Sequence, residues 1–200
     1  VVISDKHERR LAETAESLGV VGIPCDVTDE TSVRNLIDAA AARLGAIDVL
    51  VNNAGLGGTA ELHEMTDDQW SVVLDVTLNG TFRCMCAELQ FLYANGAGVI
   101  VNNASVLGWR AQAGQAHYAA AKAGVMALTR CAAIEAAPRG VRINAVSPSL
   151  AMHANLAKVT SDELLHELTQ REAFGRYAEP WEIANVIVFL ASDYSSYMTG

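Results

Sequence analysis

Five short apolar runs alternate with amphipathic segments along the chain. They lie at Val1–Ser4, Val20–Cys25, Ile47–Val51, Val99–Asn102 and Val141–Val146. Strands that alternate with helices form right-handed βαβ units, and these build a parallel sheet with helices on both faces. Ile47–Val51 is apolar apart from Asp48, which is typical of a strand that is buried on both faces. The sequence therefore predicts an α/β fold, a doubly wound parallel sheet flanked by helices.

The segments between these runs have helical periodicity. The expected helices are His7–Leu18, Glu30–Leu44, Thr66–Leu92, Ala116–Ala136, Ser161–Arg171 and Pro180–Leu190. Thr28 or Asp29 is expected to cap the second of them. With 200 residues and no internal repeat or linker, we expect one domain over residues 1–200. Residues 149–175 are the candidate for a mobile substrate lid beyond the carboxyl ends of the strands.

The charge balance excludes two classes of partner. The formal net charge is −9 and no run of Lys or Arg marks a basic patch, so we expect neither nucleic acid nor a membrane surface as a partner. No apolar run approaches the roughly 18 residues of a membrane span, and we expect no signal peptide. The cysteines form no CxxC pair and the histidines have no zinc spacing, which favours reduced, mostly buried thiols, no metal site and a cytoplasmic protein. The cysteines are Cys25, Cys84, Cys86 and Cys131.

One residue pair has a spacing with a chemical consequence. Tyr118 and Lys122 lie four apart in the expected helix Ala116–Ala136, so both side chains lie on one face. A tyrosine with a pKa of about 10 is a poor acid–base catalyst at neutral pH, and a neighbouring ammonium favours the phenolate and lowers that pKa. Alone, the spacing is also compatible with a solvated helix face. His117 points elsewhere on the helix, as a structural residue would.

Polar residues follow two of the expected strands. Ser105 comes just after Val99–Asn102 and thirteen residues before Tyr118, where its hydroxyl could bond a substrate oxygen, although an ordinary turn serine is the alternative. Asn52-Asn53-Ala54-Gly55 follows Ile47–Val51. The asparagines can tie neighbouring strand ends together, and Ala54-Gly55 lets a flat ring approach the backbone closely. A plain Asn-Gly type of turn is the alternative.

Together these pieces resemble a known family. From Val1 to Gly200 the chain closely resembles the short-chain dehydrogenases/reductases of the compact, bacterial ketoreductase-like type. The matching pieces, in the family's order and spacing, are Cys25-Asp26-Val27, Asn52-Asn53-Ala54-Gly55, Ser105 with Tyr118 and Lys122, Asn144-Ala145-Val146-Ser147-Pro148, and Phe189-Leu190-Ala191-Ser192 through Thr199-Gly200. The resemblance implies a Rossmann-like fold and hydride transfer between a nicotinamide cofactor and an alcohol or carbonyl.

The resemblance also assigns roles to residues. It implies that Tyr118 is the general acid/base, that Lys122 binds the nicotinamide ribose and lowers the pKa of Tyr118, and that Ser105 polarises the substrate oxygen. The residues implied to bind the cofactor, besides Tyr118 and Lys122, are Asp5, Asp26, Val27, Asn53, Ala54, Gly55, Pro148 and Ala151.

Asp5 bears on the choice of cofactor. In the family an acidic residue at this position binds the adenosine ribose hydroxyls and repels a 2′-phosphate, which favours NAD(H) over NADP(H). Arg9 and Arg10 could accept that phosphate, so NADP(H) stays an alternative. Asp5 could instead cap the helix that begins near His7.

The chain departs from the family pattern in three places. The glycine-rich phosphate turn would precede Asp5 and a final strand would follow Gly200, so we expect that residues are missing at both ends. Thr77 stands where the family has an asparagine that holds a water in a proton relay to the lysine. A backbone carbonyl could supply that role, so Thr77 is kept among the catalytic candidates. Ser149 and His153 replace a Gly and a Thr, and His153 could contact the cofactor or substrate or lie on the surface.

The substrate pocket is expected around the loop between Ser105 and Tyr118. Candidate substrate contacts are Leu107, Gln115 and His153. Arg110 follows Trp109 in this loop and could meet a carboxylate or a phosphate-bearing carrier such as coenzyme A, or be a solvated surface charge. The expected lid is apolar, which favours an acyl-thioester, a steroid-ring fragment or a simple secondary alcohol, although helix packing explains the same residues. They are Leu150, Met152, Leu156, Leu164 and Leu165.

We therefore expect an NAD(P)-dependent oxidoreductase that interconverts a secondary alcohol and a ketone, with NAD(H) favoured. The alternative is a non-catalytic nucleotide-binding or regulatory protein on the same scaffold, which would have no need of Ser105, Tyr118 and Lys122 together. The helices 66–92 and 116–136 form the usual oligomer interface in the family, so a homodimer or homotetramer is expected.

Overall fold

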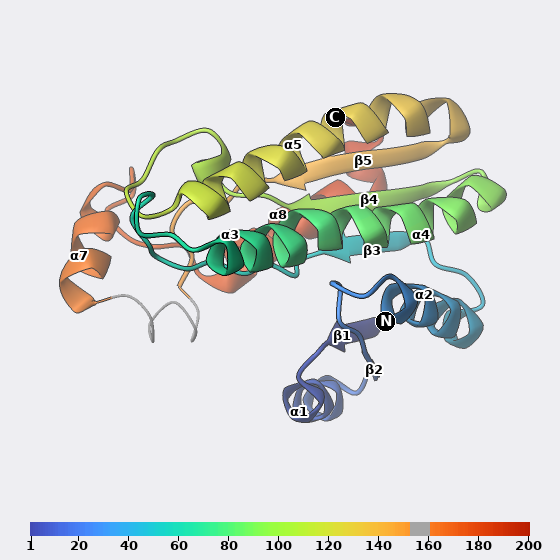
Figure 1. The fold of residues 1–200 in the computed structure, drawn as a ribbon. Helices are drawn as coiled ribbons and strands as arrows, with labels where there is room; N and C mark the ends of the chain where they lie inside the picture. The colour runs from blue at the N-terminus through green and yellow to red at the C-terminus, as the bar shows by residue number, and fades with distance from the viewer. Residues whose placement is uncertain (153–160) are drawn as a thin grey trace.

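The computed structural model describes residues 1–152 and 161–200 and shows parallel β-sheets flanked by helices (Figure 1). The strands are β1 (Val2–Asp5), β2 (Val21–Pro24), β3 (Val49–Asn52), β4 (Gly98–Asn103) and β5 (Val141–Val146). The helices are α1 (Glu8–Leu18), α2 (Glu30–Leu44), α3 (Asp67–Leu74), α4 (Gly80–Asn95), α5 (Ala116–Ala136), α7 (Asp162–Gln170) and α8 (Pro180–Ala191). Short 3₁₀ turns lie at Val106–Gly108, Ala137–Arg139 and Asp193–Ser195. None of the described helices is long and apolar enough to cross a membrane.

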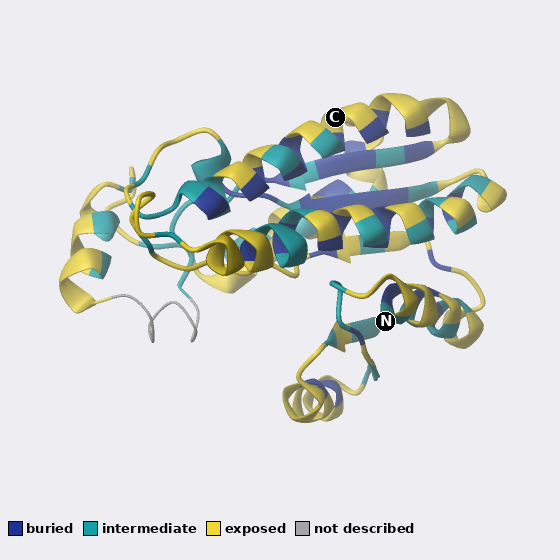
Figure 2. Ribbon diagram, in the orientation of Figure 1, coloured by how far each residue is buried: buried dark blue, intermediate teal, exposed yellow. Residues whose placement is uncertain are grey.

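β4 and β5 form the buried centre of the molecule. They belong to a parallel sheet with the order β3-β4-β5. Ile100 and Ile143 pack against α4 and α5 on one face, whereas Val99 and Val101 pack against α8 on the other (Figure 2). Successive side chains of a strand point to opposite faces, so these strands need helices on both sides. This is the doubly wound arrangement that the sequence predicts.

β3 is less buried than its apolar sequence predicts. Val49 and Val51 are 39% and 41% exposed, so the expectation of burial on both faces is wrong for this strand. The physical reason is that α8 packs on β4 and β5. Among the described residues, Val49 and Val51 do not belong to the buried cluster that α8 forms with β4 and β5.

The expected single sheet is found in two parts. β1 and β2 pair in parallel, and within the described ranges no ladder joins them to β3. α1 lies close against this pair, where a Cβ at Gly22 would lie 3.1 Å from Cγ of Leu11. Asp29 caps α2, because its side chain accepts from the backbone N–H of Thr31. Its residue Val33 packs against α4, so α2 connects the two sheets.

The long helix expected over Thr66–Leu92 is interrupted. Thr66 and Gln69 form a capping box at the start of α3. The chain then makes a π-helical turn over Asp75–Asn79 before α4 begins. π-helical turns are rare and are frequent at functional sites. Here the turn carries the fully buried Thr77.

The cysteines differ from expectation in their burial. All four are free thiols, but Cys86 and Cys131 are exposed, whereas Cys25 and Cys84 are buried. Burial raises the pKa of Cys84 to about 12. The buried thiols are therefore core residues that stay protonated at neutral pH.

Candidate active site

Three polar side chains converge beyond the carboxyl end of β4. Tyr118 and Lys122 lie one turn apart on α5, and Ser105 follows β4. Lys122 Nζ lies 5.5 Å from the centroid of the Tyr118 ring and donates to the backbone carbonyl of Asn103 at 2.5 Å. Ser105 Oγ accepts from the backbone N–H of Leu107 at 3.2 Å, and the Ser105 side chain lies close enough to Tyr118 to affect the pKa of its phenol. The structure thus brings together the three residues that the sequence singled out.

Burial shifts the pKa values of Tyr118 and Lys122. Ser105 and Lys122 are 8% and 3% exposed. Burial raises the pKa of Tyr118, and the Ser105 side chain offsets part of that rise. Burial also lowers the pKa of Lys122 to about 8. That Lys122 lowers the pKa of Tyr118 stays a prediction, and in this structure removal from water disfavours the charged form of both residues.

Asparagine side chains join the ends of β3 and β4. Asn52 Nδ2 donates to Asn102 Oδ1 at 2.9 Å, and Asn103 Nδ2 donates to Asn53 Oδ1 at 2.7 Å. The expected tie between neighbouring strand ends is therefore confirmed. Asn102 and Asn103 escape notice in the sequence, although a second Asn-Asn pair at a strand end is a visible signal. The tie places the Asn103 carbonyl that holds Lys122.

The loop after β3 runs across the first turns of α5. Residues 53–55 are exposed, and a Cβ at Gly55 would lie 3.5 Å from Lys122 Nζ. Thr77 Oγ1 accepts from the backbone N–H of Leu56 at 3.0 Å and donates to the carbonyl of Leu56 at 3.2 Å. The Thr77 hydroxyl thus uses both hydrogen bonds to hold this loop in place.

The same loop is held from the amino end of α5. Gln115 Nε2 donates to the carbonyl of Gly58 at 2.8 Å and to Thr59 Oγ1 at 3.2 Å. The Gln115 amide, expected to contact substrate, therefore holds the loop. Leu107 lies partly buried in the 3₁₀ turn beside Ser105.

The remaining expected residues follow β5. The Pro148 carbonyl accepts from the backbone N–H of Val106 at 3.0 Å, which keeps the ends of β4 and β5 adjacent. Ala151 forms a parallel bridge with Ala178, just before α8. His153 lies outside the described residues.

A polar network lies at the mouth of the site. Ser149 Oγ donates to Glu172 Oε1 at 2.6 Å, and Arg110 Nη2 lies 3.5 Å from Ser149 Oγ. Glu172 follows α7, so the contact connects the expected lid to the end of β5. Within the described ranges, Arg110 pairs with no carboxylate, and its neighbour Trp109 is 73% exposed.

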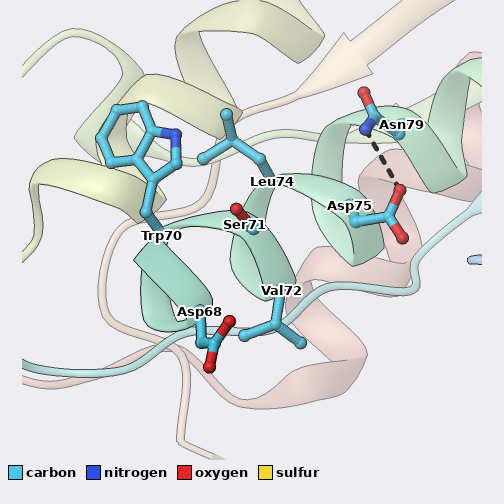
Figure 3. A pocket seen from close by; sticks show the side chains of 7 residues that line it. All are labelled: Asp68, Trp70, Ser71, Val72, Leu74, Asp75 and Asn79. Carbon is cyan, nitrogen blue, oxygen red and sulfur yellow. Dashed lines mark hydrogen bonds between the residues drawn. The ribbon is translucent and has the colours of Figure 1, made fainter. Parts of the chain in front are cut away.

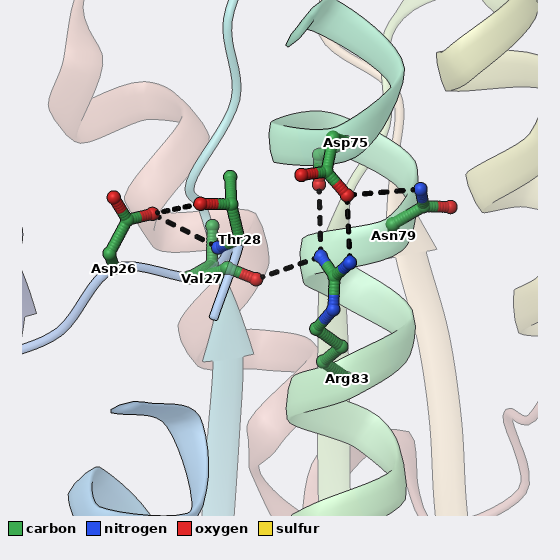
Figure 4. Close-up of polar contacts among 6 residues, drawn as sticks. All are labelled: Asp26, Val27, Thr28, Asp75, Asn79 and Arg83. Atoms are coloured by element: carbon green, nitrogen blue, oxygen red, sulfur yellow. Dashed lines mark hydrogen bonds and ion pairs between the residues drawn. The ribbon is translucent and has the colours of Figure 1, made fainter. Parts of the chain in front are cut away.

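Two expected cofactor residues, Asp5 and Asp26, lie near the ends of β1 and β2. Asp26 Oδ1 accepts from the backbone N–H of Thr28 at 3.0 Å and from its hydroxyl at 2.8 Å (Figure 4). These bonds hold the pKa of Asp26 below its usual value. Asp5 accepts from the backbone N–H of His7 at 2.8 Å and pairs with Arg10 at 2.6 Å. Asp5 therefore binds the residue that precedes α1 but does not cap the helix, whose N-cap is His7, and its role in cofactor binding stays a prediction.

Two surface hollows lie apart from Tyr118. The larger, of about 560 Å³, is lined by residues of α3 and the π-helical turn (Figure 3). Those residues are Asp68, Trp70, Ser71, Val72, Leu74, Asp75 and Asn79. The volume of a hollow therefore does not identify the catalytic site in this protein, because Ser105, Tyr118 and Lys122 do not line the larger hollow. The smaller, of about 360 Å³, has Asp26 and Lys6 in its wall.

The buried ammonium of Lys122 tests whether the site fits a nicotinamide cofactor. An ammonium has three N–H donors, and within the described residues Lys122 donates to the Asn103 carbonyl alone. Buried donors require acceptors, and two neighbouring ribose hydroxyls beside Gly55 would supply them. The residues present therefore fit the group. Within the same ranges, no cluster of three or more His, Cys, Asp or Glu could hold a metal ion.

Comparison with known proteins decides the family. The family model described as "Enoyl-(Acyl carrier protein) reductase" matches residues 1–200. A solved structure, a short chain dehydrogenase from Mycobacterium smegmatis, is 55% identical with a TM-score of 0.87 and covers 100% of this chain, which spans 77% of that structure. The chain belongs to the short-chain dehydrogenases/reductases.

Relatives of this short-chain dehydrogenase/reductase act on hydroxyl or keto groups. A protein of Mycobacterium tuberculosis named "(5R,7aS)-5-hydroxy-7a-methyl-1-oxo-2,3,5,6,7,7a-hexahydro-1H-indene-carboxyl-CoA reductase" is 63% identical over 100% of this chain and 79% of its own length. A cis-4-hydroxycyclohexanecarboxylate dehydrogenase of Sinomonas cyclohexanicum is 44% identical over 88% of this chain and 70% of its own length. The chain is accordingly an oxidoreductase of alcohol and keto groups.

Solved relatives hold both forms of the nicotinamide cofactor. A xylitol dehydrogenase bound to NAD+ is 30% identical with a TM-score of 0.91, covering 99% of this chain and 84% of that one. A gluconate 5-dehydrogenase from Burkholderia cenocepacia in complex with NADP and tartrate is 31% identical with a TM-score of 0.93, covering 99% and 80%. A nicotinamide cofactor is thus supported for this short-chain dehydrogenase/reductase, and either form suits the fold.

Proposed function

We propose that this enzyme interconverts a secondary alcohol and a ketone, with NAD(H) as cofactor and Tyr118 as the acid/base. The observation that carries the proposal is the buried convergence of Ser105, Tyr118 and Lys122, in which Lys122 keeps two N–H donors for a ribose. The cofactor, when bound, supplies or accepts the hydride. A non-catalytic regulatory role does not account for this arrangement.

Each residue then has a task that follows from its environment. Burial keeps Tyr118 protonated at neutral pH, which is the form that donates a proton to a carbonyl oxygen. Ser105 Oγ steadies the same oxygen as negative charge develops on it. Thr77 and Gln115 hold the loop after β3, so that a flat ring can lie along Ala54 and Gly55.

The full-length protein is expected to bind NADH more tightly than NADPH, because Asp5 repels a 2′-phosphate. Arg10 pairs with Asp5 and screens that repulsion. Arg10→Ala should therefore widen the preference for NADH severalfold, whereas Arg9→Ala, at an exposed pair with Glu13, should leave it unchanged. Fluorescence titration with both cofactors measures this.

Two results would count against the proposal. Tighter NADPH binding that Arg10→Ala abolishes would assign Arg10 to the phosphate and reverse the cofactor preference. Binding of neither cofactor by the full-length protein would remove the basis of the oxidoreductase mechanism.

For the substrate we propose a ring alcohol or ketone that carries a carboxyl group or its thioester. Two relatives whose names describe such compounds are 63% and 44% identical to this chain. The exposed Trp109 offers an apolar surface, and Arg110 offers a cation without a carboxylate partner in the described ranges. The apolar residues of the expected lid, Leu164 and Leu165 among them, suit the same ring.

Arg110→Ala is expected to raise KM for a carboxylated cyclic ketone roughly tenfold, because a charge-assisted hydrogen bond is lost. The KM for neutral cyclohexanone should stay the same. Arg43→Ala, at an exposed arginine of α2, serves as the control. An equal rise for both ketones would show that Arg110 does not recognise the anion.

We also infer that copies of the enzyme associate through α3, α4 and α5 as a homodimer or homotetramer in the cytoplasm. Phe82 on α4 and Ile134 on α5 are 50% and 78% exposed, and such apolar side chains favour an interface. Light scattering on the full-length protein measures the size of the assembly.

A further inference from the structure

Arg83 reaches from α4 to two backbone segments that are distant in sequence. Arg83 Nη1 donates to the carbonyl of Val27, in the loop after β2, at 3.2 Å. Nη2 donates to Asp75 Oδ1 at 2.8 Å, and Asn79 Nδ2 donates to the same oxygen at 3.1 Å (Figure 4). The guanidinium thus joins the loop after β2 to the π-helical turn.

The side chain of Val27 adds a second contact to the same place. A Cβ at Gly80 would lie 2.7 Å from Val27 Cγ2, so Val27 occupies space that only glycine leaves open. The next residues of the loop are ordered by Asp26, which accepts two hydrogen bonds from Thr28. The loop is therefore held by its backbone carbonyl and by its apolar side chain.

The π-helical turn holds a second loop through Thr77, whose hydroxyl bonds both backbone groups of Leu56. One turn of helix therefore positions the loop after β2 and the loop after β3. Under the proposed function, the first loop would lie against adenine and the second beside nicotinamide. The spacing between the two loops then depends on the contacts of this turn.

We propose that Arg83 is a positioning residue for the adenosine end of the cofactor, acting through Val27 and supported by Asp75. The inference rests on the proposed function, because it presumes a dinucleotide lying across both loops. Without Arg83 the Val27 carbonyl and the Asp75 carboxylate lose a charged donor that is 23% exposed at its side chain. The loop after β2 then keeps the apolar contact of Val27 with Gly80 but is held less firmly against the π-helical turn.

The test compares NADH with reduced nicotinamide mononucleotide, which lacks the adenosine half. Arg83→Ala in the full-length protein should raise Kd and KM for NADH roughly tenfold, with kcat nearly unchanged. The KM for the mononucleotide should stay at the wild-type value. Arg83→Lys can donate to one acceptor at a time and should recover part of the NADH affinity. Arg34→Ala removes the same charge from an exposed pair with Glu30 and should change nothing.

Asp75→Asn keeps an oxygen acceptor but loses the charge, so it should give an intermediate rise in KM for NADH. If Arg83→Ala does not fold, the same comparison of NADH with the mononucleotide is made with Asp75→Asn and Arg83→Lys. Unchanged NADH binding in these variants, or an equal loss for NADH and the mononucleotide, would overturn the role of Arg83. Failure of the wild-type protein to bind NADH at all would overturn the proposed function and this inference with it.

Discussion

Tyr118→Phe is expected to lower kcat for ketone reduction by about a thousandfold, because the hydroxyl that donates the proton is removed. The aromatic ring remains, so the packing beside Lys122 and the affinity for NADH should stay close to wild type. Steady-state kinetics at saturating NADH and a fluorescence titration of the cofactor measure the two quantities separately.

Tyr93→Phe provides the matched control for this variant. The Tyr93 ring on α4 lies 4.2 Å from the Arg139 guanidinium carbon, and removal of its hydroxyl leaves that contact in place. Turnover in this control should equal that of the wild type. Retained turnover in Tyr118→Phe would instead show that another group transfers the proton.

Glu88→Gln is expected to stabilise the protein at pH 8 by up to about 3 kcal/mol. Glu88 on α4 is fully buried, and neither carboxylate oxygen has a hydrogen-bond partner among the described residues. Burial raises the pKa of this carboxyl from 4.5 to about 7. Between about pH 4.5 and 7 the folded protein therefore holds a proton that the unfolded chain releases, and above pH 7 the folded protein carries a buried charge.

The sign of the pH dependence follows from that raised pKa. Below about pH 4.5 Glu88 is protonated in both the folded and the unfolded state, so its ionisation does not lower the free energy of unfolding. Between pH 4.5 and 7 only the unfolded chain ionises at Glu88, so the destabilisation of the folded protein by Glu88 grows with pH. Above pH 7 this destabilisation is constant. Urea unfolding at a fixed protein concentration across this range measures the difference between Glu88→Gln and wild type.

Glu135→Gln is the control, since Glu135 is exposed on α5. Its effect on the free energy of unfolding should be small and nearly independent of pH. A stability difference for Glu88→Gln that does not change between pH 4.5 and pH 8 would contradict the prediction.

The periodicity of apolar residues along the chain was sufficient to predict much of the fold. α2 and α5 have the bounds that periodicity predicts, since each has an uninterrupted apolar stripe and a clear end. The π-helical turn at Asp75–Asn79 was not predicted, because one extra residue in a turn leaves the overall helical pattern almost unchanged. The exposure of Val49 and Val51 depends on where α8 packs, which periodicity within β3 does not contain.

Some residues of the candidate site could likewise be predicted from the sequence, whereas others could not. Spacing on one helix was enough to place Tyr118 and Lys122 together, and the parallel sheet brings Ser105 to them. Arg83 had no such signal, because its acceptor Val27 belongs to a distant segment. Glu88 had none either, because its burial depends on how α4 packs against other elements.

The sequence by itself determined the order of strands and helices, the face shared by Tyr118 and Lys122, and the asparagine pair Asn52-Asn53 at the end of β3. These properties depend on repeat periods and on neighbours along the chain. The tertiary structure decided the protonation of Tyr118, the pairing of Asp5 with Arg10 and the reach of Arg83 to Val27. Such properties depend on burial and on which side chains meet in space, and both arise only when the elements pack together.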